Sequence, residues 1–151
     1  MTHPDSWMRI KQVAAQRRDV SARGLARLVT RATHAQQKLQ LLLEYRLDYR
    51  ARFESASRKG MRGEWLRNYQ MFIANLEQAI ALQTNTVTAM RHEVCEAKKR
   101  VDGEQRRVES YQIIDDHRSG VALTREQRTE QRLQDEMASR VIPQLAANGE
   151  S

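Results

Sequence analysis

A seven-residue hydrophobic repeat runs along two stretches of this chain and restricts the fold to a coiled coil. In both stretches the spacing alternates between three and four, as in helices that share a seam. Arg46 is the only charged position in the first stretch, and Gln83 and Glu104 are the only charged or amide positions in the second. The seam positions are Leu25, Leu28, Ala32, Ala35, Leu39, Leu42, Arg46, Tyr49, Phe53 and Ala56, followed by Leu66, Tyr69, Ile73, Leu76, Ile80, Gln83, Val87, Met90, Val94, Ala97, Val101, Glu104, Val108 and Tyr111.

Residues 59–63 interrupt this pattern and mark a turn between two helices. Gly60 and Gly63 each lower helix propensity by about 1 kcal/mol, and glycine supplies the positive φ of a helix C-cap. Helices joined by so short a connection pack antiparallel, which would bring Phe53 near Tyr69.

The rest of the chain permits long helices. Pro4 and Pro143 are the only prolines, and strand-like alternation is absent. We therefore predict an all-α fold for residues 1–151 as a single domain, a long two-helix antiparallel coiled-coil hairpin with helices over about 6–58 and 64–140. Pro143 is expected to end the second helix, after a candidate kink near 119–120 and before a disordered tail over about 143–151.

The first 42 residues carry most of the positive charge. They contain eight Lys/Arg and two Asp, which is +6 of the chain's net +7. Such a basic arm favours an anionic partner (an acidic protein surface, anionic lipid or nucleic acid), although an ordinary solvated face has the same composition. Ile10, Val13 and Val20 form an apolar stripe in a register different from the seam after Leu25, which predicts a stutter in the coiled coil.

The sequence has no pattern typical of an enzyme. Its four histidines are far apart and none has i, i+4 spacing, so we expect no metal site. A glycine-rich phosphate loop is also missing, and we expect no cofactor. Cys95 is alone, no apolar run approaches the roughly 18 residues needed to span a bilayer, and the start lacks a signal peptide. These features predict a non-enzymatic protein of the cytosol.

Several aromatic residues near the turn lie beside the seam. Phe72 and Ala79 each precede a seam position by one residue, and Trp65 continues that line. Tyr45 has the equivalent place on the first helix. An exposed line of this kind indicates a partner site, but the spacing is equally consistent with a widened seam that covers the hairpin core.

Short motifs in this region occur together at a specific spacing. They are Tyr45 and Tyr49, Tyr69-Gln70-Met71-Phe72, Leu76 with Ala79-Ile80, and the later Asp135-Glu136. With these motifs the chain resembles the flagellar type III export protein FliJ family, from near the N-terminus to about Arg140.

The resemblance implies a non-enzymatic antiparallel coiled coil, similar to the γ stalk of rotary ATPases, that is cytoplasmic and peripheral at the inner membrane. FliJ-like proteins bind the hexameric export ATPase and promote its assembly, contact the cytoplasmic linker of the export gate protein FlhA, and escort substrate-specific export chaperones. The matching gate positions are Leu42, Tyr45, Tyr49, Phe72, Leu76 and Ala79. Lys38 and Gln83 depart from the Gln and His of relatives at the upper edge of that surface.

By analogy with the γ stalk, the open end of the hairpin enters the ATPase ring. In this chain that end comprises the basic arm and the segment after Ser119, and the candidate contacts are Arg17, Arg18, Arg27 and Arg31. Two alternatives stay open: the equivalent stalk of a virulence type III secretion system, and a basic binder of nucleic acid or membrane surfaces through residues 9–38. The Tyr-Gln-x-Phe motif favours the flagellar branch, for which no nucleic-acid partner is expected.

Overall fold

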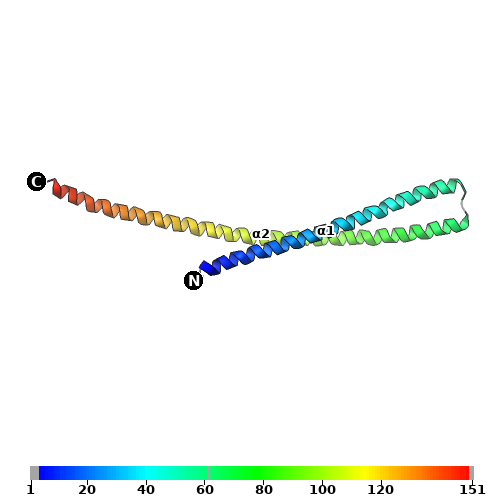
Figure 1. Ribbon diagram of the computed structural model, residues 1–151, viewed down its shortest axis with the longest axis horizontal. Coiled ribbons are helices and arrows are strands. Elements are labelled where there is room, and N and C mark those ends of the chain that lie inside the picture. The colour runs from blue at the N-terminus through cyan, green and yellow to red at the C-terminus, as the bar shows by residue number, and fades with distance from the viewer. Residues whose placement is uncertain (1–3, 61, 150–151) are drawn as a thin grey trace. The chain divides into compact units, whose positions relative to one another are not determined.

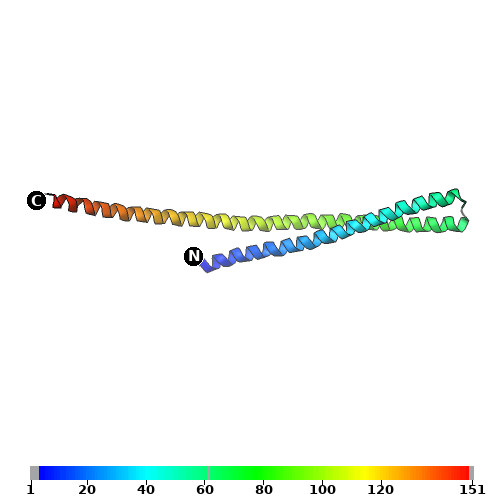
Figure 2. The same cartoon turned by 45° about the horizontal axis from the view of Figure 1, so that its top comes forward.

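Two helices account for nearly all of residues 4–60 and 62–149, which the computed structural model describes. α1 spans Pro4–Arg58 and α2 spans Gly63–Asn148. α1 and the first half of α2 run side by side in opposite directions (Figures 1 and 2), so the predicted all-α hairpin is confirmed. The chain forms two compact units: Met1–Gln105, which is the hairpin, and Arg106–Ser151, which contains the rest of α2.

The turn depends on one glycine. Gly60 has a φ of 89°, a left-handed conformation that residues with a Cβ rarely adopt. Its amide nitrogen donates a hydrogen bond of 3.3 Å to the carbonyl of Ser57, and the Lys59 amide donates one of 3.2 Å to Ala56. These bonds cap carbonyl groups at the end of α1. The predicted turn centre, Met61, lies outside the described residues.

The predicted seam is the inner face of the hairpin. All ten α1 positions are half-buried, and Leu76, Ile80, Val87 and Ala97 of α2 are buried. Leu66 is the exception: it is 39% exposed because it belongs to the first turn of α2, at the very end of the hairpin. The prediction that Leu66 lies within the seam is therefore wrong.

The basic arm follows the same repeat as the rest of α1, so the predicted stutter is also wrong. Its inward positions are Lys11, Ala14, Arg18 and Ser21, and Ala14 is only 3% exposed. Ile10, Val13 and Val20 are 40%, 45% and 58% exposed. The seam downstream of Leu25 sets the rotation of a continuous helix, and this rotation turns the apolar stripe outward.

α2 continues beyond its predicted end near Arg140. It passes through Ser119, Gly120 and Pro143 as helix and ends at Asn148. Proline removes one backbone donor and disfavours helix, but a helix can continue past it with one hydrogen bond fewer. α2 is thus longer than the sequence predicted. The disorder expected over about 143–151 stays a prediction.

The buried and exposed leucines allow a matched test of the seam. We expect Leu76→Ala, at an 8% exposed position, to lower the free energy of unfolding by about 2–3 kcal/mol. Leu47→Ala makes the same chemical change at a 68% exposed position and should cost less than about 0.5 kcal/mol. Urea denaturation followed by circular dichroism measures both. Equal losses would contradict the packing described for α2.

Candidate docking face

One side of the hairpin is closed by ion pairs. Glu77 of α2 accepts hydrogen bonds from two arginines of α1: Arg46 Nη1 lies 3.1 Å from Oε2, and Arg50 Nη2 lies 3.0 Å from Oε1. Arg46 occupies a seam position, and its side chain is 29% exposed, against 53% for Arg50. Arg46, the one charged seam position of α1 between Leu25 and Ala56, is thus paired across the hairpin.

Amide groups extend this polar side away from the turn. Gln83, a seam position, donates from Nε2 to the carbonyl of Ala35 at 2.9 Å. Arg91 donates from Nη2 to Oε1 of Gln36, also at 2.9 Å. Together with the Glu77 pairs, these bonds fix how α1 and α2 lie against each other. We call this side, with Arg50, Glu77, Gln36 and Arg91, the polar side.

Two aromatic stacks join the helices near the turn. Tyr49 stacks on Phe72 with ring centroids 4.1 Å apart, and Phe53 stacks on Tyr69 at 3.8 Å. The interplanar angles are 24° and 14°. Aromatic pairs of this kind contribute roughly 0.5–1.5 kcal/mol beyond the area that they bury. The predicted proximity of Phe53 and Tyr69 is confirmed.

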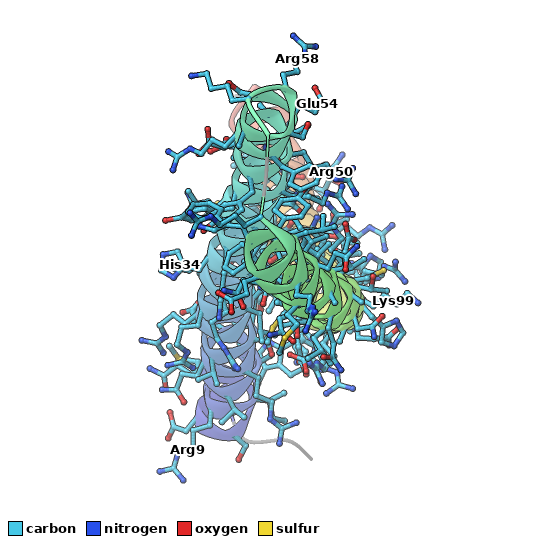
Figure 3. The ribbon with its side chains drawn as sticks, turned by 90° about the vertical axis from the view of Figure 1, so that its right-hand side faces the viewer. Arg9, His34, Arg50, Glu54, Arg58 and Lys99 are labelled. Atoms are coloured by element: carbon cyan, nitrogen blue, oxygen red, sulfur yellow. The ribbon has the colours of Figure 1, made fainter. Side chains whose placement is uncertain are left out.

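The opposite side of the hairpin exposes large apolar groups. Tyr45 is 57% exposed, Trp65 is 66% exposed and Phe72 is 39% exposed. An open groove of about 570 Å³ lies there, with Arg52, Trp65 and Phe72 in its lining. Figure 3 shows His34 and Arg50 pointing to opposite sides of α1. His34 lies three residues after Arg31 and four before Lys38, which places it on the same side as Tyr45. We call this side the aromatic side.

The six predicted gate positions do not all reach solvent equally. Tyr45 is the most exposed and Phe72 lies at the groove, whereas Leu76 is 8% exposed and belongs to the closed seam. Leu42, Tyr49 and Ala79 are half-buried between these extremes. The aromatic line is therefore partly exposed surface and partly seam.

Two exposed leucines on this side were missed by the sequence analysis. Leu41 is 56% exposed and precedes Tyr45 by one helical turn, and Leu82 is 64% exposed and lies three residues after Ala79. Both leucines could have been found from the sequence, because each lies on a second seven-residue repeat that runs beside the seam. A search limited to the seam and its immediate neighbours does not detect that repeat.

The four arginines predicted to contact the ATPase fall into two groups. Arg17, Arg27 and Arg31 are exposed, and no ion pair engages them among the described residues. Arg18 is a half-buried seam position whose guanidinium lies 3.2 Å from Asp19 Oδ1. Arg18 is thus half-buried and paired within α1, and the other three are available to a partner.

Other kinds of site have little support in the described part of the chain. No group of three His, Cys, Asp or Glu side chains there could hold a metal ion. None of the helices in that part is long and apolar enough to cross a bilayer. The hydrogen bond between Lys99 and Glu96 is the main cause of a lowered pKa for Glu96 and a raised pKa for Lys99, but this pair lies on the exposed surface of α2.

Comparison with known proteins gives one consistent family. The model of the family described as flagellar FliJ protein matches residues 8–144. The chain belongs to the flagellar FliJ protein family. It is 29% identical over 131 residues to the flagellar FliJ protein of Salmonella typhi and 28% identical over 131 residues to that of Escherichia coli strain K12. Each alignment covers 87% of this chain and 89% of the relative.

The family assignment confirms the resemblance inferred from the motifs around the turn. It supports a place for this FliJ family member in the flagellar export apparatus. It also favours the flagellar interpretation over the virulence stalk and over the basic nucleic-acid or membrane binder.

The polar side makes a prediction about pairwise energies. In double-mutant cycles with alanine, the Arg46–Glu77 pair should give a coupling energy of about 1–2 kcal/mol, because Arg46 is mostly buried. The more exposed Arg50–Glu77 pair should give about 0.5 kcal/mol or less and should weaken more in salt. Thermal or urea unfolding of the single and double variants measures both. A larger coupling for Arg50 would overturn this ranking.

Proposed function

We propose that this chain is a non-enzymatic stalk of the flagellar type III export apparatus, peripheral at the cytoplasmic face of the inner membrane. In this role it binds the hexameric export ATPase, promotes its assembly, contacts the linker of the export gate protein FlhA and escorts export chaperones. The observation that carries the proposal is the exposed Tyr45 and Phe72 on one side of a hairpin from the FliJ family.

The chemical difference between the polar side and the aromatic side supports a docking role. The polar side already makes its ion pairs within the chain, since Glu77 binds two arginines. The aromatic side leaves Tyr45 and Trp65 largely in water, and aromatic residues are strong contributors to protein interfaces. A gate segment that covered Tyr45 and Phe72 would bury apolar surface without breaking an ion pair of the hairpin.

The basic arm supports contact with the ATPase at the other end of the hairpin. Within the part of the chain that the structure describes, Arg17, Arg27 and Arg31 have no ion pair to lose on binding. Charges of this kind steer association and add affinity when they meet an acidic surface. The hydrolysis of ATP is then carried out by the partner, and this chain transmits the contact from the arm to the aromatic side.

The gate contact is tested by aromatic truncation. We expect Tyr45→Ala with Phe72→Ala to weaken binding to the isolated gate linker at least tenfold in a pull-down or titration calorimetry. Because Phe72 also stacks on Tyr49, Tyr45→Ala alone is measured too and should retain helicity. Leu47→Ala with Met71→Ala, at 68% and 66% exposed positions away from this side, is the matched control. Unchanged gate binding by both Tyr45 variants would refute the proposed gate contact.

The ATPase contact is tested by charge reversal in the arm. Arg17→Glu with Arg27→Glu should reduce co-purification of this chain with the flagellar export ATPase. The variant should also fail to stimulate ATP hydrolysis by that ATPase, while its own unfolding midpoint stays unchanged. Arg18→Glu should instead lower stability, because Arg18 lies in the seam. Arg23→Glu, an exposed arginine on the outer face of α1, should retain ATPase binding. Equal loss in the Arg23 variant would mean that only net charge matters.

A further inference from the structure

A second seven-residue repeat runs along α1 beside the seam, on the aromatic side. Its apolar members are Val13, Val20, Leu41 and Tyr45, which are 45%, 58%, 56% and 57% exposed. Spacings of three, four and seven residues place these side chains on one line of a helix. From Val13 to Tyr45 this line is roughly 48 Å long at about 1.5 Å per residue.

The same line carries a row of unpaired cations. Arg17, Arg27, Arg31 and Lys38 lie on it, all four are exposed, and none has an ion pair among the described residues. The polar side differs, because its exposed Arg50 is paired with Glu77. Four unpaired cations of α1 therefore share this line, and Arg9, Arg23 and Arg58 lie on the outer face of the helix.

Acidic groups are nearly missing from this line. Asp48 is the one acidic residue on it between residues 10 and 52, and its carboxylate lies 3.1 Å from Arg52 on the same helix. The facing line of α2, from Trp65 to Ala89, contains no Asp or Glu and exposes Phe72 and Leu82. We call the strip of the aromatic side between these two lines the trough. It has cations along α1 and apolar groups along α2 as far as Ala89, beyond which Glu93 follows on the α2 line.

We infer that this trough binds an acidic amphipathic α-helix as the third strand of a coiled coil. Apolar residues of the incoming helix at three-four spacing would cover Leu41, Tyr45 and Leu82. Its Glu and Asp residues, flanking that apolar stripe, would pair with Arg31 and Lys38, as charges beside a seam do in coiled coils. The inference deepens the proposed docking function by stating the chemistry of the partner segment, whichever component presents it.

Other occupants fit less well. A second copy of this chain would bring the same row of cations against itself, and like charges would oppose the contact. Nucleic acid or an anionic membrane would use the cations but would leave Leu41 and Leu82 without a role. An acidic helix uses both the unpaired cations and the exposed apolar groups.

The experiment uses the full chain and three synthetic helical peptides of about 28 residues. One peptide has leucine at three-four spacing flanked by glutamate, the second has lysine in place of glutamate, and the third is a scrambled form of the first. Fluorescence anisotropy at physiological salt should show binding of the first peptide only, with affinity that falls as salt increases. Equal binding of the scrambled peptide would overturn the inference, because simple charge attraction would then suffice.

Variants of the chain locate the contact. Arg31→Glu with Lys38→Glu, and separately Leu41→Ser with Leu82→Ser, should each weaken peptide binding at least tenfold. Arg23→Glu with Arg67→Glu changes the net charge equally at exposed positions outside the trough and should change affinity less than twofold. If the control pair weakens binding as much as the Arg31 pair, or if duplex DNA or anionic liposomes bind more tightly than the peptide with the same dependence on Arg31 and Lys38, the inference is wrong.

Failure of this inference and failure of the proposed function are distinguishable. The peptides contain no export component, so their binding is independent of any gate or ATPase contact. Loss of gate binding in the Tyr45 variants with no binding of the acidic peptide would retain the docking function and reject the helical partner. Peptide binding without any gate contact would retain the trough and reject the gate assignment.

Discussion

The seam between α1 and α2 is the interaction on which the hairpin depends. It buries Leu76, Ile80 and Val87, and the described residues have no second layer of structure to cover them. A two-helix hairpin has little interior, so its stability is concentrated where the seam is most apolar. That region is the half near the turn, where two aromatic stacks and the Glu77 ion pairs add to the leucines.

The part of the basic arm before Leu25 also depends on the seam, which sets how this part of α1 faces α2. Its inward positions include Lys11 and Arg18, and one carboxylate oxygen of Glu104, on the α2 seam, is buried without a hydrogen bond. A buried acceptor without a donor costs about 1–3 kcal/mol. The part of the arm before Leu25 therefore continues the rotation of the downstream seam, and Ala14 is the one apolar side chain that it buries fully among the described residues.

Sequence periodicity predicted the seam, the turn and the antiparallel pairing because each is a local or repeating property. Leucines at three-four spacing specify one face of a helix, and Gly60 marks the turn because it lies where two such repeats are interrupted. Hydrophobicity alone predicts the wrong inward face for the arm, because the repeat that continues from the seam after Leu25 decides which residues face α2. Ile10 and Val13 are more apolar than Lys11 and Ala14, but a helix cannot change its facing without an insertion.

The candidate site was predictable in its centre and not at its edges. Tyr45 and Phe72 could be found because they precede seam positions, whereas the exposure of Leu41 and Leu82 follows only when both helices are in place. The structure was also needed to show which side of the hairpin leaves its side chains open to a partner. Glu77 lies one residue after Leu76 and Phe72 one residue before Ile73, and only their contacts show that the first side is closed by charge and the second is not.

The described part of this thin hairpin offers an open groove along one side, so its specificity is distributed along that side. Exposed apolar residues on a helix reduce solubility unless a partner covers them or charges separate them. Here Arg27, Arg31 and Lys38 lie between Val20 and Leu41 on the same line of α1, and Arg17 lies between Val13 and Val20. These cations keep the apolar line soluble in the free chain, and because they are unpaired, they also give an acidic partner groups to bind. The rotation imposed by the apolar half of the seam thus determines which residues of the arm a partner meets.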